Sequence, residues 1–205
     1  MKNMNWSLQT RFLHLGLVMT ITAQLFSSLI MTVPAKGGTG LIGLTAYQVH
    51  VMFGLSAFAI VLIHWLWVFL SEKDRSFSHL FPLTQSGRQL IVDDLRAIRH
   101  AEFGNLNQRG GLAGLVQGLG LLAVSAVATT GLFIFLTLSE TAKPGFITQA
   151  FMEWHSGLAT FVWVYWLGHG SMGILHHLNG SDHLSKMFRF DDIERKAKSR
   201  CSNPV

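Results

Sequence analysis

The sequence predicts an all-α membrane protein, a single domain in which four transmembrane helices form a bundle. Of its 205 residues, 49% are hydrophobic and only 13% are charged. Four stretches contain no Asp, Glu, Lys or Arg, and each is long enough to cross a bilayer as a helix. They are residues 12–35, 37–71, 110–139 and 154–181. Because these stretches lack the alternating pattern of membrane barrel strands, helices remain as the spanning structure.

Allowing for turns, we predict spans near 12–33, 46–70, 112–138 and 152–176, a loop at 71–111 and a tail at 177–205, all within one domain, 1–205. Of the 16 Lys and Arg residues, all but Lys36 and Lys143 lie before the first span, between the second and third, or after the fourth. Basic residues favour the cytoplasmic side, so both termini and the long loop are expected there. The net charge of +5 then reflects contact with anionic headgroups, and no nucleic-acid partner is expected.

The first span contains His14 and a polar stripe at helical spacing. We interpret the stripe as contacts between helices. The span is longer than the apolar region of a signal peptide and lacks a small-residue cleavage site, so it is expected to be retained. The stripe consists of Thr20, Gln24, Ser27, Ser28 and Thr32.

The second span contains His50, Gly54 and His64. In the loop that follows, residues 86–100 are predicted to form an amphipathic helix on the cytoplasmic membrane surface, with Ser86 as its N-cap. Docking of a partner protein is the alternative role for this helix.

The third span has no histidine and forms a wall of the bundle, with Gly114 and Gly118 allowing close helix approach. The fourth span contains His155 and His169, and a short charged helix is predicted at 190–199. The lone Cys201 excludes an intramolecular disulfide, a cysteine-ligated iron–sulfur cluster and covalent haem attachment through paired cysteines.

The histidines are the ionisable residues at membrane depth, which makes them functional candidates. His155 and His169 are 14 residues apart, nearly four helical turns, so both leave the same helix face about 21 Å apart along the axis. The direction of each span places His50 level with His155 near the outer side. It places His14 level with His169 near the inner side, with His64 at the inner level too.

Two opposed imidazoles at one level suit the two axial positions of a haem iron, whereas zinc usually gathers three or four ligands. Gly54 and Gly173 each lie one turn beyond a histidine, on the same helix face, and would leave room for a porphyrin. The pattern favours two non-covalent b haems per chain in a four-helix core.

At these positions the chain resembles the bacterial cytochrome b561 family, which is related to the b-type cytochrome subunits of nickel–iron hydrogenases. The likeness is carried by Trp154-His155, the interval to His169 and the pair His176-His177 in the fourth span, and by the first span's Arg11-Phe-Leu-His14 and the second span's His50-x-x-x-Gly54. It covers roughly residues 5–190. The resemblance implies axial ligand roles for His50 and His155 at the outer haem and for His14 and His169 at the inner haem. In a small cytochrome b561 of this family, an arginine stands in place of His64.

We therefore expect a di-haem cytochrome that transfers electrons across a bacterial inner membrane. The resemblance implies the quinone pool as one redox partner, with superoxide or a periplasmic donor as the other. A homodimer is compatible with this expectation. The alternatives are a haem-bearing anchor subunit of a larger respiratory oxidoreductase and, in another class, a non-haem metal transporter or membrane scaffold. Arg11, Gly54, His64 and Gly173 are the expected haem surroundings, with Arg11 placed to neutralise an inner propionate.

Overall fold

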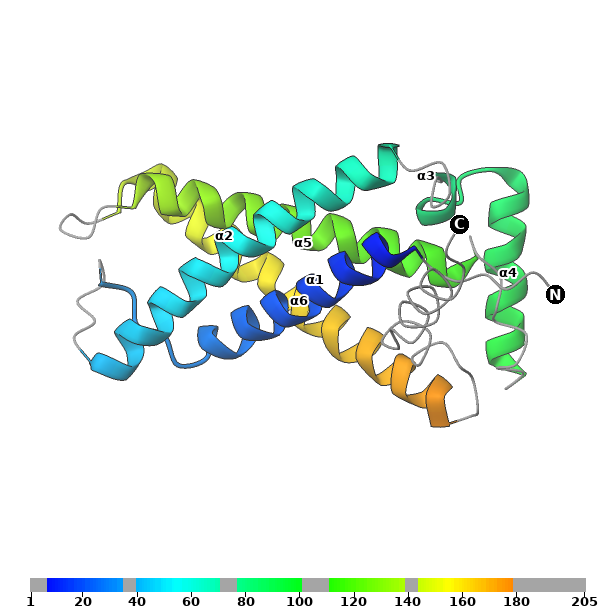
Figure 1. Cartoon of the computed structure of the whole chain (residues 1–205), viewed down its shortest axis with the longest axis horizontal. Coiled ribbons are helices and arrows are strands. Elements are labelled where there is room, and N and C mark those ends of the chain that lie inside the picture. Colours follow the sequence, from blue (N-terminus) through cyan, green and yellow to red (C-terminus); the bar gives the residue numbers. More distant parts are fainter. Residues whose placement is uncertain (1–6, 35–39, 71–76, 101–110, 139–143, 179–205) are drawn as a thin grey trace, which may run out of the picture.

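The computed structural model describes residues 7–34, 40–70, 77–100, 111–138 and 144–178. This part of the chain is helical and contains no strand. The two short helices, α3 and α4, precede the third long helix along the chain (Figure 1). The elements are α1 (Leu8–Ser28), α2 (Leu41–Leu70), α3 (Phe77–Leu80), α4 (Gln85–Arg99), α5 (Leu112–Thr137) and α6 (Phe146–Leu178).

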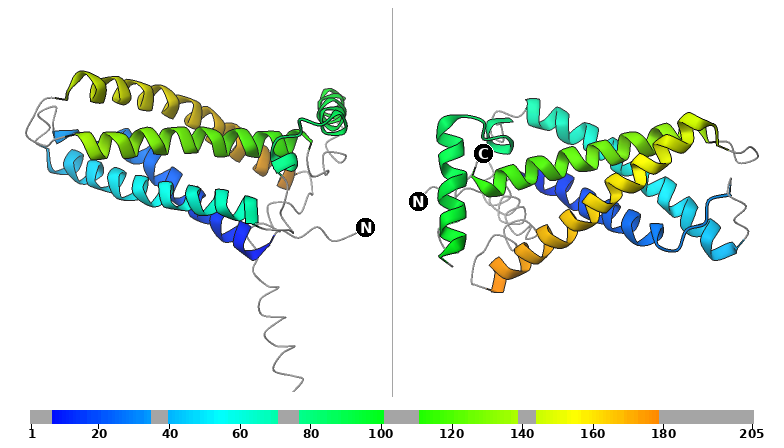
Figure 2. Two further views of the ribbon diagram at one scale, coloured as in Figure 1. Left: turned by 90° about the horizontal axis from the view of Figure 1, so that it is seen from above. Right: turned by 180° about the vertical axis from the view of Figure 1, so that it is seen from behind.

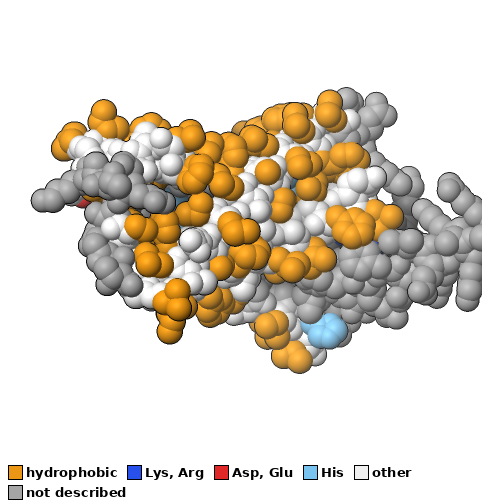
Figure 3. Space-filling model, turned by 60° about the vertical axis from the view of Figure 1, so that its left-hand side comes forward, with side chains coloured by type: hydrophobic (Ala, Val, Ile, Leu, Met, Phe, Trp, Pro, Cys, Tyr) orange, Lys and Arg blue, Asp and Glu red, His pale blue; other side chains and the backbone are white. Residues whose placement is uncertain are grey.

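Three of the described helices, α2, α5 and α6, are long and apolar enough to cross a membrane. Many of their large apolar side chains are exposed, such as Phe161 at 70% and Val164 at 67%. Figure 3 shows hydrophobic side chains spread over the described helices of one face. Such a surface suits lipid rather than water. Helix α1 lacks a comparably apolar window, so a fourth span remains a prediction.

The helices differ from the predicted spans mainly at their starts. Helix α1 begins earlier than residue 12 because the Ser7 hydroxyl caps it, accepting the Thr10 backbone N–H at 3.2 Å. It also ends at Ser28, after which the Thr32 N–H donates to the Gly43 carbonyl at 3.0 Å and ties the turn to α2. Helices α2 and α6 begin five or six residues before the predicted starts at 46 and 152, since a helix continues beyond the hydrocarbon layer.

The long helices form two pairs, α1 with α2 and α5 with α6, and contacts between α2 and α5 join them. Figure 2 shows the two pairs as neighbouring layers. Helix α6 makes few close backbone approaches to α1 or α2. Side chains from α6 must therefore reach across the bundle to meet those two helices.

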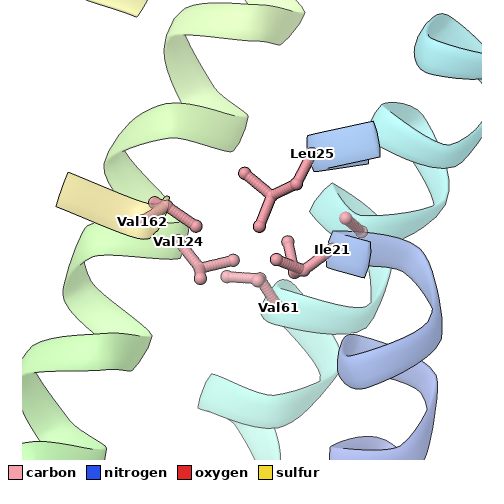
Figure 4. Packing of buried hydrophobic residues seen from close by; sticks show 6 residues of the cluster. Ile21, Leu25, Val61, Val124 and Val162 are labelled. Atoms are coloured by element: carbon pink, nitrogen blue, oxygen red, sulfur yellow. The ribbon is translucent and has the colours of Figure 1, made fainter. Parts of the chain in front are cut away.

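An apolar core joins α1, α2, α5 and α6 (Figure 4). Along α6, the buried Val162 lies midway between His155 and His169. The core therefore separates two levels of the bundle, one at each histidine. Its buried members are Ile21, Leu25, Ala57, Val61, Val124 and Val162.

The predicted loop helix is present as α4, which lies across one end of the bundle, steeply inclined to the long helices (Figure 1). Its N-cap is Thr84, whose hydroxyl accepts the Gly87 N–H at 3.1 Å, so the prediction of Ser86 was wrong. Thr84 and Ser86 are both hydroxyl residues in one polar run, and the sequence pattern cannot tell which of them caps the helix. This end is called the basic end, because Arg88, Arg96 and Arg99 lie on α4. The predicted helix at 190–199 and Cys201 lie outside the described residues.

Candidate functional site

Two pairs of histidine rings face each other across the bundle, one pair at each level. His50 of α2 and His155 of α6 have ring centres 6.2 Å apart, with ring planes 79° apart. His14 of α1 and His169 of α6 have ring centres 6.3 Å apart, with planes 62° apart. The second pair lies nearer the basic end. The structure thus brings together the two pairs that the depths of the helices predict.

Helix α1 fixes the ring of His50. The His50 Nδ1 atom lies 3.1 Å from the Gln24 carbonyl and 3.2 Å from the Ser27 hydroxyl. Ser27 donates its own proton to the Gln24 carbonyl at 3.1 Å, so its oxygen is left to accept. The hydrogen-bond network therefore assigns a proton to Nδ1, and the Nε2 lone pair remains available to a metal ion.

Helix α5 fixes His155 in the same way. The His155 Nδ1 atom lies 3.0 Å from the Thr130 hydroxyl, which donates to the Val127 carbonyl at 2.9 Å. Thr130 is buried, with 8% of its surface exposed. Its oxygen therefore accepts from Nδ1–H, and Nε2 of His155 is again the available nitrogen.

At the other level, His169 is flanked by an aromatic ring. Tyr165 lies one turn earlier on α6 and stacks on His169 with ring centres 5.2 Å apart and planes 11° apart. The Tyr165 ring in turn lies on the backbone of α5 at Gly120, where any Cβ atom would overlap it. Stacking thus orients His169, whereas hydrogen bonds to Nδ1 orient the histidines of the other pair.

The ring separations fit a metal ion shared by two axial imidazoles. A bond from a metal to an imidazole nitrogen is about 2 Å long, and the ring centre lies about 1 Å beyond the nitrogen. Two opposed ligands therefore have ring centres roughly 6 Å apart. Within the described residues, no three His, Cys, Asp or Glu side chains gather as a metal site. Two ligands per level match haem, whose porphyrin supplies the other four bonds to iron.

Comparison with protein families decides the assignment. A model of the prokaryotic cytochrome b561 family matches residues 5–190, which is most of the chain. The chain belongs to the prokaryotic cytochrome b561 family. No curated protein and no solved structure matches the chain significantly. The match to the family model confirms the resemblance seen in the sequence. The protein is a b-type cytochrome that carries b-type haem and transfers electrons in a membrane.

The residues that were expected to surround the haems lie on α1, α2 and α6. Arg11 lies on α1, one turn before His14 towards the basic end, and only 3% of its surface is exposed. His64 lies at the same level, within electrostatic range of His14. Gly54 faces Gln24, whose amide nitrogen lies 3.1 Å from the position of a Cβ atom and donates to the His50 carbonyl. Gly173 lies on α6 and is half-buried.

Four residues beside the ring pairs were not predicted as part of the site. Gln24 and Ser27 belong to the polar stripe of the first helix, and their spacing did signal a contact between helices. Thr130 had no such signal, because it contacts His155 through the register of α5 against α6, which one sequence does not reveal. Tyr165 lies four residues before His169 on the same helix, so that spacing could have indicated their contact.

Proposed function

We propose that this cytochrome holds two b haems per chain. His50 and His155 are the axial ligands of the outer haem, and His14 and His169 are those of the inner haem. The observation that carries the proposal is the matched separation of the two ring pairs, 6.2 and 6.3 Å, at two levels of one bundle. Haem iron supplies one-electron redox chemistry when it is bound.

The chain contributes ligation, spacing and exclusion of water. His50 with His155, and His14 with His169, would each hold an iron from two sides, which would leave no position for a substrate at the metal. The two proposed ligands on α6 are about 21 Å apart along the helix axis, so one site would lie towards each face of the bilayer. The apolar core at Val162 lies between these levels and keeps water out of the path.

A quinone is the proposed membrane-soluble redox partner. A groove of about 450 Å³ lies between α1 and α2 near the outer pair, and an apolar ring with an isoprenoid tail suits its lining. The groove reaches Ser27, whose hydroxyl contacts His50 at 3.2 Å. Its lining residues are Ser27, Ile30, Leu41, Ile42, Thr45, Ala46 and Val49.

The quinone assignment is tested by narrowing the groove. Thr45→Trp should slow haem reduction by a short-chain quinol several-fold while haem content stays unchanged. Thr129→Trp, at an exposed position on α5, is the control. Stopped-flow absorbance measures the rate of haem reduction. An unchanged rate in Thr45→Trp would mean that the groove holds lipid chains and not a quinone.

We further propose that the chain lies in a bacterial inner membrane, with α4 and both termini in the cytoplasm. The basic end formed by α4 supports this orientation. Superoxide or a periplasmic donor would then supply electrons on the outer side. A stoichiometric subunit that co-purifies with the chain would instead identify it as the haem-bearing anchor of a larger oxidoreductase.

The haem stoichiometry is tested by a pyridine haemochrome assay on the purified protein, together with a reduced-minus-oxidised spectrum. We expect two haems b per chain, and acidified organic solvent should extract both, since no cysteine pair tethers them. His177→Ala, an exposed position at the end of α6, should retain both. One haem or none in fully loaded native protein would remove one or both ring pairs from the proposal.

A further inference from the structure

We propose that Tyr165 is a positioning residue that fixes the plane of the His169 imidazole at the inner haem. This inference rests on the proposed ligand role of His169. It concerns how the ligand is held, which the family assignment leaves open. Three observations carry it: the ring stack, the contact of Tyr165 with the backbone of α5, and the contrast with the outer pair.

The stack leaves His169 little freedom to turn. Its ring is nearly parallel to that of Tyr165, at 11°, with centres 5.2 Å apart, which lies within the range of offset-stacked pairs. The direction towards His14 lies across the bundle. If the His169 imidazole rotated about the line that joins it to His14, one of its edges would overlap the Tyr165 ring.

Tyr165 has little room to move, because the backbone of α5 lies against the phenol end of its ring. A Cβ atom built on Gly120 would lie 2.6 Å from Cε2 of Tyr165 and closer still to its Cζ and Oη atoms. Gly120 is buried, so the aromatic ring rests directly on the helix backbone. A side chain at position 120 would overlap the Tyr165 ring and displace it.

The outer pair is held by different means. His50 and His155 have oxygen acceptors at Nδ1 from α1 and α5, and these bonds fix the nitrogen as well as the plane. A stack fixes the plane without adding an acceptor to the ring. Tyr165 therefore controls the orientation of the His169 ring without changing the electron density that this ring donates.

The test is electron paramagnetic resonance of the ferric protein. In low-spin haem with two imidazole ligands, the largest g value depends on the angle between the two ligand planes. Tyr165→Leu should shift or broaden this signal for one haem only, the haem whose signal disappears in His14→Ala. Tyr165→Phe keeps the ring and should give the native signal. Phe161→Leu makes a similar change at a lipid-facing position one turn earlier on α6 and should also leave both signals native.

Gly120→Ala provides a second perturbation that retains the tyrosine. It should displace the ring and shift the same signal. Unshifted signals in Tyr165→Leu would overturn the inference. If Tyr165→Leu fails to retain the inner haem, Gly120→Ala decides in its place: a shifted inner signal supports the inference and a native signal contradicts it. Native protein without two low-spin ferric signals would instead refute the proposed function.

Discussion

Thr130 shows how a single hydroxyl group can determine which nitrogen of a histidine faces the centre of the bundle. Thr130→Val keeps the shape of the side chain but removes the acceptor 3.0 Å from His155 Nδ1. The imidazole then donates less electron density, so the ferric state is less favoured and the outer haem potential should rise. A hydrogen bond worth about 1 kcal/mol corresponds to roughly 40 mV for one electron.

Thr129→Val is the matched control for that substitution. Its hydroxyl donates to the Ser125 carbonyl of its own helix and its side chain is exposed. A spectroscopic redox titration should show an upward shift for Thr130→Val and none for Thr129→Val. Equal potentials in the two variants would remove Thr130 from the outer site.

Arg11 is a charged residue that is almost fully buried on the first helix. We predict that it lies beside a propionate of the inner haem, and that Arg11→Gln lowers the inner potential, because a cation favours the more electron-rich state. Arg88→Gln, on the exposed side of α4, should leave the potential unchanged. If the Arg11→Gln titration also matched the native curve, the arginine would serve only as a positive-inside anchor.

His64 is predicted to support the inner haem without ligating its iron, since His14 and His169 already face each other. His64→Ala should retain both haems but alter the inner potential or the quinone reaction. His14→Ala should lose the inner haem, which difference spectra and haem assays would record. The opposite pattern, with haem lost in His64→Ala and kept in His14→Ala, would show that His64 is the ligand.

At the scale of elements, α4 is attached to the bundle through a cap on α5. The Asp94 carboxylate accepts the Leu112 N–H at 2.8 Å, and Gly111 before it has no side chain to do so. A carboxylate at a helix N-terminus also interacts favourably with the helix dipole. Asp94 is only 7% exposed, so this bond is shielded from water.

Removing the cap should destabilise the cytochrome. Asp94→Ala is expected to lower the free energy of unfolding by about 1 kcal/mol, as for other helix caps. Asp93→Ala is the control, because Asp93 is exposed. Its carboxylate pairs with Arg96 at 3.3 Å and accepts from the Gln89 amide at 3.4 Å on the surface, where such contacts contribute little. Thermal unfolding in detergent, followed by circular dichroism, should show a lower midpoint for Asp94→Ala alone. Equal midpoints would contradict the capping role.

At the scale of the whole molecule, the two ring pairs should behave as separate sites. The apolar core between them contains no member of either pair. His50→Ala or His155→Ala is therefore expected to reduce the haem content from two to about one, with the inner spectrum preserved. Loss of both haems in either variant, measured by the haemochrome assay, would mean that the sites are not independent.

Much of this architecture could be predicted from the sequence because lipid imposes long apolar helices. The interval between His155 and His169 likewise predicted two levels, since helix geometry converts spacing into depth. What could not be predicted was rotation between helices. Thr130 reaches His155 and Gly120 supports Tyr165 only because α5 and α6 pack in one register. Nor could the first residues of α2 and α6 be located, because hydropathy marks the lipid layer and not the helix end.

The separation of α6 from α1 and α2 also bears on how the cell makes this protein. Under the proposed ligation, each iron would cross-link α6 to a helix that it otherwise approaches at few positions. Cofactor binding would then stabilise the folded chain by mass action. Without haem, the two halves of the bundle would be held by the contacts between α2 and α5, by the apolar core, and by the Trp166 indole N–H of α6, which donates to the Thr22 hydroxyl of α1 at 3.1 Å. Haem supply would therefore set how much of the newly inserted chain matures and how much is left for membrane proteases.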